Sequence, residues 1–289
     1  MTKTDADRAG GTTTLSARLF APGSRLTWLA ALLLLAVGAV WVLLTPEGIL
    51  GKADAVGYAV CHRIAARSFT LPGGRPVPLC ARCSGTFLGV LVGLLGPVLL
   101  FGRRRAGGFP RLGLMVVMLG MTAWWGFDGA NSFAHLIPRE GIPRLYEPTN
   151  FLRLTTGMFN GITLGGLILP VLNATLWAGA TDEPVLGRWW ELLALYGTGA
   201  ALIAMVYSEV PVLLYPLAVL SAVGVVAILA AVMTVFVTTL LRRENRARTL
   251  ADAVPLVLLG LTAALVMIGG IDAVRYAMFG TWDGFVPPA

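Results

Sequence analysis

Charged residues are scarce in this chain, at 13% of its 289 residues. Soluble domains typically carry about 25%. Apolar residues make up 56% and gather in long uninterrupted blocks. In lipid, backbone polar groups must be satisfied within a helix or a closed barrel, and blocks of about 20 apolar residues are too long for barrel strands. The sequence therefore predicts an all-α, polytopic membrane helix bundle with about seven transmembrane helices.

The chain also lacks the short motifs of several enzyme classes. It has no Walker loop, no Gly-x-Ser-x-Gly elbow and no His-Glu-x-x-His, so phosphoryl and acyl transfer have no support and the sequence leaves open whether the protein is an enzyme. The net charge of +7 does not indicate nucleic-acid binding, because the arginines sit in short runs between apolar blocks. The partner that we expect is the lipid bilayer and no nucleic acid; the sequence names no soluble partner and no oligomeric state.

The apolar blocks set the expected organisation of the chain. The predicted spans cover about 26–44, 84–101, 112–127, 151–177, 189–207, 212–240 and 254–279. The first block is longer than the apolar region of a signal peptide, so we expect a retained span. We divide the chain into a polar cytoplasmic tail at 1–25, a four-helix membrane core with a cysteine-bearing outer loop at 26–179, and three further membrane helices at 180–289.

Basic residues in the short loops predict the orientation. Three clusters precede the first span, separate the second from the third, and separate the sixth from the seventh: Lys3, Arg8, Arg18 and Arg25; Arg103, Arg104, Arg105 and Arg111; Arg242, Arg243, Arg246 and Arg248. With seven spans, a cytoplasmic N-terminus puts all three clusters inside, as the positive-inside rule requires. We therefore expect the N-terminus inside, with the C-terminus and the cysteine-bearing loop outside.

Two predicted spans carry glycine at every fourth position. The ladders are Gly85, Gly89 and Gly93 in the second span, and Gly157, Gly161 and Gly165 in the fourth. Residues four apart lie on one helical face, and glycine there lets another backbone approach closely. We predict that these two helices pack tightly, on each other in the simplest arrangement.

Cysteine is also scarce: the chain has Cys61, Cys80 and Cys83. An odd number excludes a fully paired set of intramolecular disulfides. The spacing of Cys80 and Cys83 suits two thiolates that share a tetrahedral metal ion, and it equally suits a redox dithiol. A c-type haem site is not expected, because Ser84 stands where that motif has His.

A metal site, for zinc or else iron, is the interpretation that we place first. Its candidate ligands are Cys61, His62, Cys80, Cys83 and His135. Neighbours on a helix point about 100° apart, so Cys61 and His62 can share one ion only if the backbone there is extended. His135 is the other source of an imidazole. A structural disulfide, a redox-active thiol pair and inert thiols stay open as alternatives.

Polar residues near the outer ends of the third and fourth spans form a second group. Asp128, Asn131 and His135 are spaced i, i+3, i+7, so they share a helical face. Charged groups in a span need partners, and we expect Asp128 to pair with Arg153. In the last span, Asp272 and Arg275 are spaced for an i, i+3 salt bridge. The predicted pocket and polar network comprise Arg63, Arg67, Arg82, Asp128, Asn131, Asn150, Arg153, Thr156 and Asn160.

These residues together resemble an uncharacterised family of bacterial and archaeal integral membrane proteins, catalogued only as a domain of unknown function. The resemblance covers about residues 55–165, and many relatives have Gln where this chain has Arg63. It implies a multi-pass protein of a prokaryotic plasma membrane and brings no established activity. The motifs that carry it are Cys61-His62-Arg63, Arg67-Ser68-Phe69, Pro78-Leu79-Cys80-Ala81-Arg82-Cys83-Ser84-Gly85, Asp128-Gly129 and Asn150-x-x-Arg153-x-x-x-Gly157.

Three functions fit the sequence. The first is a membrane protein with a Cys/His metal site at the extracytoplasmic mouth of the bundle, surrounded by arginines whose charge favours thiolates. The second is a thiol–disulfide exchanger that uses Cys80 and Cys83, with Cys61 as the resolving thiol, and passes electrons to a membrane quinone. The third is a transporter, or a membrane scaffold with a structural disulfide, although the halves show no inverted repeat.

Overall fold

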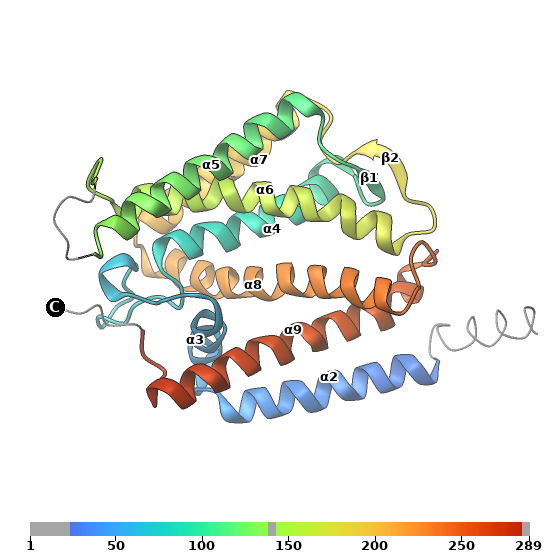
Figure 1. The fold of residues 1–289 in the computed structure, drawn as a ribbon, viewed down its shortest axis with the longest axis horizontal. Helices are drawn as coiled ribbons and strands as arrows, with labels where there is room; N and C mark the ends of the chain where they lie inside the picture. The colour runs from blue at the N-terminus through green and yellow to red at the C-terminus, as the bar shows by residue number, and fades with distance from the viewer. Residues whose placement is uncertain (1–23, 138–142, 285–289) are drawn as a thin grey trace, which may run out of the picture.

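The computed structural model describes residues 24–137 and 143–284. Within these ranges it is an all-α bundle with seven helices long and apolar enough to cross a membrane (Figure 1). The fold class and the number of spans predicted from the sequence are therefore confirmed, while residues 1–23 of the predicted tail lie outside the described ranges. The spanning helices are α2 (Arg25–Leu44), α4 (Ala81–Phe101), α5 (Leu112–Ala134), α6 (Asn150–Leu176), α7 (Trp189–Tyr207), α8 (Pro211–Leu240) and α9 (Leu250–Phe279).

Local sequence signals explain where several of these helices begin and end. Thr149 caps α6 by accepting a hydrogen bond from the Leu152 amide at 3.2 Å. Thr249 and Asp252 form a reciprocal capping box at the start of α9. Gly102 ends α4 and Gly280 ends α9, both in the left-handed conformation that glycine adopts without a steric penalty.

The close pairing of α4 and α6 forms the centre of the bundle. A Cβ atom added at Gly85 or Gly89 would overlap the backbone of α6, and one added at Gly157 or Gly161 would overlap the backbone of α4. The two glycine ladders thus face each other, and the predicted packing of these helices is confirmed. Because glycine alone permits this separation, the ladders fix which faces of α4 and α6 meet.

Four short elements were not predicted from hydropathy. Helix α3 (Gly48–Val60) follows the first span and, at 13 residues, is too short to cross a bilayer. A 3₁₀ turn, η1 (Ala65–Arg67), leads on to the cysteine pair. Strands β1 (Ala106–Gly108) and β2 (Thr181–Pro184) pair in parallel beyond the ends of the spans.

The arginine-rich loops and the cysteine-bearing loop lie at opposite ends of the bundle. The start of α2 and the β1–β2 pair lie at one end, and α3 and the end of α9 lie at the other (Figure 1). Arg105 joins two of the basic loops by donating to the carbonyl oxygen of Arg248 at 2.7 Å. The predicted orientation requires the basic loops to lie at one end of the bundle, and they do. Which end faces the cytoplasm stays a prediction.

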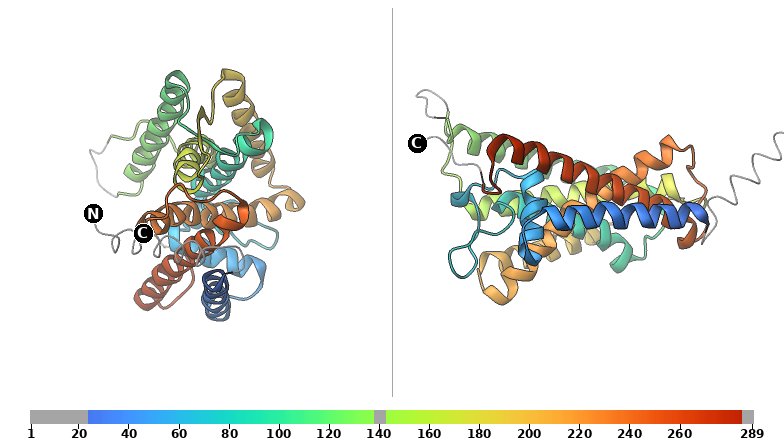
Figure 2. Two further views of the ribbon diagram at one scale, coloured as in Figure 1. Left: turned by 90° about the vertical axis from the view of Figure 1, so that its right-hand side faces the viewer. Right: turned by 90° about the horizontal axis from the view of Figure 1, so that it is seen from below.

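The first and last spans lie side by side. Helix α2 packs along α9, on the flank of the bundle away from α5 (Figures 1 and 2). Trp41 of α2 reaches across this contact to Asp272 of α9. The predicted division of the chain at residue 179 stays a prediction. In the fold, the first and last spans, which belong to different parts of that division, are in contact.

Candidate functional site

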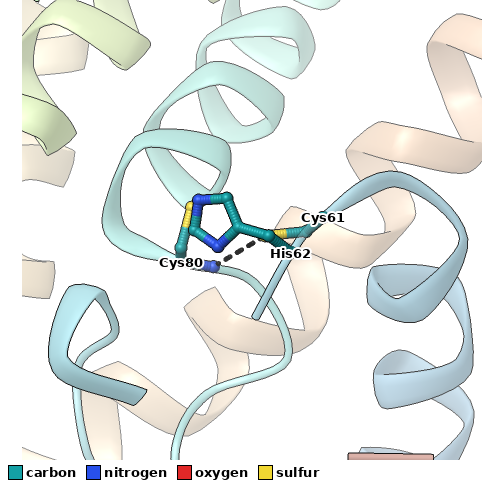
Figure 3. Close-up of side chains that lie close together, drawn as sticks. All are labelled: Cys61, His62 and Cys80. Atoms are coloured by element: carbon teal, nitrogen blue, oxygen red, sulfur yellow. Dashed lines mark hydrogen bonds between the residues drawn. The ribbon is translucent and has the colours of Figure 1, made fainter. Parts of the chain in front are cut away.

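The three cysteines come together where α3 ends and α4 begins. Cys61 is the C-cap of α3 and has an extended backbone, with φ −131° and ψ 145°. Cys80 is the N-cap of α4, and Cys83 lies in the first turn of that helix. The candidate ligand atoms of Cys61, His62 and Cys80 all lie within 4.8 Å of one another (Figure 3). The extended backbone at Cys61 is the condition under which these neighbours can face one ion.

Hydrogen-bond donors converge on the sulfur of Cys61. The backbone amides of Arg63 and Cys80 each donate to Cys61 Sγ at 3.4 Å. Hydrogen bonds from the thiols of Cys80 and Cys83 hold the pKa of Cys61 well below its ordinary value. The Cys80 thiol, as donor to Cys61, has its pKa raised to about 12. Cys61 is therefore more acidic than Cys80, whose thiol keeps its proton more strongly.

His62 lies beside Cys61 in an environment that favours the neutral imidazole. Burial lowers its pKa, and the charge of Arg67 lowers it further, against the opposing effect of Cys61. His62 Nδ1 accepts a hydrogen bond from the Ile64 amide at 3.1 Å. A neutral imidazole has one N–H, so this bond places the proton on Nε2. To bind a metal through Nε2, His62 must give up its bond to Ile64.

The other predicted imidazole lies outside this group. Nε2 of His135 is 3.0 Å from the carbonyl oxygen of Tyr146, and Nδ1 is 3.9 Å from the carboxylate of Glu147. Asn131 binds the same segment, donating to the Tyr146 carbonyl at 2.8 Å and accepting from the Leu145 amide at 2.9 Å. Asn131 and His135 therefore tie the loop before α6 to the end of α5.

Buried arginines surround the thiol group. Arg67 is buried, and its guanidinium donates to the carbonyl oxygen of Ser132 at 2.8 Å. Burial lowers the pKa of Arg67, and the charge of Arg82 lowers it further. The charges of Arg67, Arg82 and Arg153 all act on His62. Positive charge at this density favours thiolate over thiol and needs a compensating negative group.

One fully buried carboxylate supplies part of that compensation. Asp128 forms a salt bridge with Arg82 and accepts a hydrogen bond from the Tyr146 hydroxyl at 2.8 Å. Thr156 lies 3.5 Å from the same carboxylate. The prediction that Asp128 pairs with Arg153 was wrong, because Arg153 donates a hydrogen bond to Asn150 at 2.9 Å instead. Arg82 takes its place because the glycine contacts bring the start of α4 close to α6 beside Asp128.

Arg153 and Asn160 retain buried atoms without partners among the described residues. Both side chains are buried in α6, and Arg153 Nε and Asn160 Oδ1 have no hydrogen-bond partner there. Their polar atoms lie within the bundle, as the helical spacing predicted. They belong to the same α6 segment as Thr156; Arg153 lies about one turn and Asn160 about three turns after the helix start at Asn150.

Arg63 points away from the thiols, although its amide contacts one of them. Its guanidinium forms a salt bridge with Asp54 at 2.7 Å and donates to the carbonyl oxygen of Trp282 at 2.8 Å. Its backbone is left-handed, with φ 52°. Arg63 therefore joins the cysteine loop to α3 and to the segment after α9.

The last helix also contacts this loop. Arg275 donates to the carbonyl oxygens of Tyr58 and Cys61, the latter at 2.8 Å, and its guanidinium lies 4.0 Å from the centre of the Tyr58 ring. The expected salt bridge between Asp272 and Arg275 was wrong, because Arg275 turns to these carbonyls instead. Sequence reasoning missed Asp54, Tyr146 and Arg275 as site residues. Their roles depend on contacts between distant segments, and only the isolated charge of Arg275 in an apolar span gave a signal.

Comparison with known proteins agrees with the class that the fold defines, a multi-pass membrane protein. Residues 61–167 match the family described as "Predicted membrane protein (DUF2085)". The match covers little more than a third of the chain and supports an uncharacterised membrane family. It contains the site residues from Cys61 to Asn160, together with α4, α5 and most of α6, whereas Asp54 and Arg275 lie outside it. No curated protein and no solved structure matches the chain.

Proposed function

We propose that this membrane protein binds one metal ion through Cys61, Cys80 and Cys83, with His62 as the fourth ligand. Zinc is the metal that we expect, and iron is the alternative. The observation that carries the proposal is the convergence of Cys61, His62 and Cys80 within 4.8 Å, from segments 19 residues apart. Cys83 lies outside this group of three, and we add it as the third sulfur because it follows Cys80 in the first turn of α4 and its thiol hydrogen-bonds to Cys61. Three thiolates and one imidazole form one of the ligand sets of structural zinc.

Charge around the site supports a thiolate-rich centre. The charges of three guanidinium groups act on His62, while the fully buried carboxylate that pairs with one of them is that of Asp128. Three thiolates, one neutral imidazole and a divalent ion carry one net negative charge. Such a centre offsets part of the excess positive charge, whereas three neutral thiols leave it uncompensated.

The geometry distinguishes the fourth ligand from the other three. Hydrogen bonds already link the thiols of Cys80 and Cys83 to Cys61, whereas His62 must release the Ile64 amide before Nε2 can bind. If His62 binds, the ion is enclosed and the centre braces the junction of α3 and α4. If water takes the fourth position, the site has the open coordination that metal-assisted hydrolysis requires.

The second candidate function is thiol–disulfide exchange coupled to a membrane quinone. The observation that favours it is the Nε2–H form of His62, which suits a hydrogen bond to a thiolate better than a bond to metal. In this reaction Cys80 and Cys83 lose two electrons and two protons as their disulfide forms, and the quinone becomes a quinol. Replacement of one cysteine would then trap mixed disulfides, which a metal site would not do.

We place the site on the extracytoplasmic side of a prokaryotic plasma membrane. The support is the gathering of arginine-rich loops at the opposite end of the bundle (Figure 1) and the positive-inside rule. On that side disulfides form readily, so occupancy by metal and oxidation of the thiols compete for the same sulfurs.

Metal analysis of the protein purified in detergent under reducing conditions tests the proposal. We expect one equivalent of zinc or iron in the wild type and none in Cys80→Ser. Ser84→Ala is the matched control, because Ser84 Oγ donates to the Leu79 carbonyl and not to a thiol. Stoichiometric metal in a Cys80→Ser, Cys83→Ser double variant would overturn the proposal.

A further inference from the structure

A groove of about 720 Å³ lies between α2 and α9, apart from the thiol site. Its walls are mostly aliphatic, with three aromatic side chains at one end: Trp41, Tyr276 and Trp282. The volume falls within the usual range of small-molecule sites. Val40 and Val266, on opposite walls, are each 56% exposed, so the groove opens on the side where the bundle meets lipid.

One buried carboxylate lines this groove. Asp272 is 2% exposed, and its Oδ2 accepts a hydrogen bond from Trp41 Nε1 at 3.4 Å. Its Oδ1 is buried and has no partner among the described residues. The nearest cation along the helix, Arg275, donates to carbonyls of the cysteine loop. A carboxylate in a spanning helix without a full set of partners indicates a ligand site more than a helix brace.

The aromatic residues beside Asp272 suit a particular kind of ligand. The Tyr276 and Trp282 rings lie 5.4 Å apart between centres and are tilted to each other by 37°. Aromatic faces beside a carboxylate attract quaternary and primary ammonium groups. The aliphatic walls provide for an apolar body. We propose that this groove binds a free lipophilic ammonium compound, with its cation at Asp272 and its apolar body between α2 and α9.

The groove favours a free amphiphile over a phospholipid with an ammonium head. Asp272 lies seven residues before the end of α9, which is roughly 10 Å along the helix. A phospholipid whose ammonium reached that depth would bring its phosphate in beside the carboxylate. None of the residues that line the groove is Lys or Arg. The two cations beside it are already bonded to oxygen atoms of the protein, Lys52 to Thr45 and Arg275 to the Cys61 carbonyl, so neither is free to pair with a phosphate. A ligand with a single positive charge avoids this repulsion.

Equilibrium dialysis in dodecylmaltoside micelles with labelled dodecyltrimethylammonium tests the proposal. After subtraction of protein-free micelles, we expect one saturable site, weakened at least tenfold in Asp272→Asn. That variant still offers an acceptor to Trp41, so it preserves the contact between the helices. Ala273→Trp should also abolish binding, because it fills the groove and keeps the carboxylate. Asp182→Asn, on exposed strand β2, is the control and should bind as wild type.

Competition identifies the source of the cation. Dodecylamine should displace the probe, and dodecanol at the same concentration should not. Equal saturable binding in Asp272→Asn, or no saturable binding in the wild type, would overturn the proposal. Displacement by phosphatidylethanolamine at concentrations matched to dodecylamine would contradict the free-amphiphile assignment and make this a lipid-headgroup site. None of these outcomes depends on metal in the thiol site.

Discussion

Arg275, in the last helix, donates a hydrogen bond through Nη1 to the carbonyl oxygen of Cys61 at 2.8 Å. The same guanidinium lies over the ring of Tyr58. A residue 214 positions away thus holds the backbone of the first cysteine in place. The matched stretch at 61–167 ends long before this residue, so this chain adds a support that the family match does not contain.

Loss of that support should loosen the metal without removing it. We expect Arg275→Met to release metal to a chelator about tenfold faster, since a hydrogen bond from a charged donor contributes about 1.5–3 kcal/mol. The measurement is the rate of zinc transfer to a coloured chelator. Arg104→Met, which removes an exposed arginine from the opposite end of the bundle, should leave this rate unchanged. Equal rates in Arg275→Met and the wild type would show that Arg275 does not support the site.

Removal of one partner of the Arg82–Asp128 salt bridge should lower the free energy of unfolding much more than replacement of both partners by apolar residues. Asp128→Leu leaves the buried Arg82 charge without its carboxylate, and we expect it to lower the free energy of unfolding by about 3 kcal/mol. The double variant Arg82→Met, Asp128→Leu should recover most of that loss, because it leaves no unpaired charge. Unfolding of each variant in mixed micelles with increasing sodium dodecyl sulfate gives the values. Additive losses in the double variant would contradict a coupled pair.

The glycine ladders predict opposite effects of the same substitution at two positions. Gly161→Ala places a Cβ against the carbonyl of Thr86, so we expect a loss of about 2 kcal/mol in the free energy of unfolding. Gly120→Ala on α5, where no atom lies within 4 Å of the new Cβ, should be neutral or stabilising. Thermal unfolding in one detergent compares the two. Equal stability of both variants would exclude a close backbone contact at Gly161.

The orientation can be tested with single cysteines at exposed positions. Arg75 lies in the cysteine-bearing loop with 47% of its side chain exposed, and Asp182 lies on β2 at the opposite end. In a chain without the native cysteines, Arg75→Cys should react with a membrane-impermeant maleimide in intact cells. Asp182→Cys should react only after the cells are opened. The reverse labelling pattern would show the opposite membrane orientation, with the thiol site on the cytoplasmic side.

Sequence patterns predicted the elements of this fold that depend on local physics. Long apolar runs identified all seven spans, and the spacing of glycines identified the pairing of α4 with α6. Hydropathy did not reveal α3, because a short helix of alternating small and apolar residues, such as Gly48–Val60, has no distinct signature. The parallel pair β1–β2 depends on two loops that meet only after the helices pack.

The site was predicted in part. The cysteine spacing indicated which residues could meet, and the extended backbone needed at Cys61 is present. The salt-bridge partner of Asp128 could not be predicted from the sequence, because several arginines were candidates. The contact of α4 with α6 selected Arg82. Arg275 similarly had Asp272 as its local partner, but the fold offered the carbonyl oxygens of Tyr58 and Cys61. Contacts between distant segments are decided by packing, which a single sequence does not show.

X-ray absorption at the zinc edge, on protein purified under reducing conditions, shows which atoms bind the metal. We expect three sulfur ligands at about 2.3 Å and one nitrogen at about 2.0 Å. His62→Ala should replace that nitrogen with an oxygen ligand and leave the three sulfurs in place. A first shell without sulfur, or metal-free protein with a disulfide between Cys80 and Cys83, would contradict the metal site. The disulfide result would leave thiol exchange as the function to pursue.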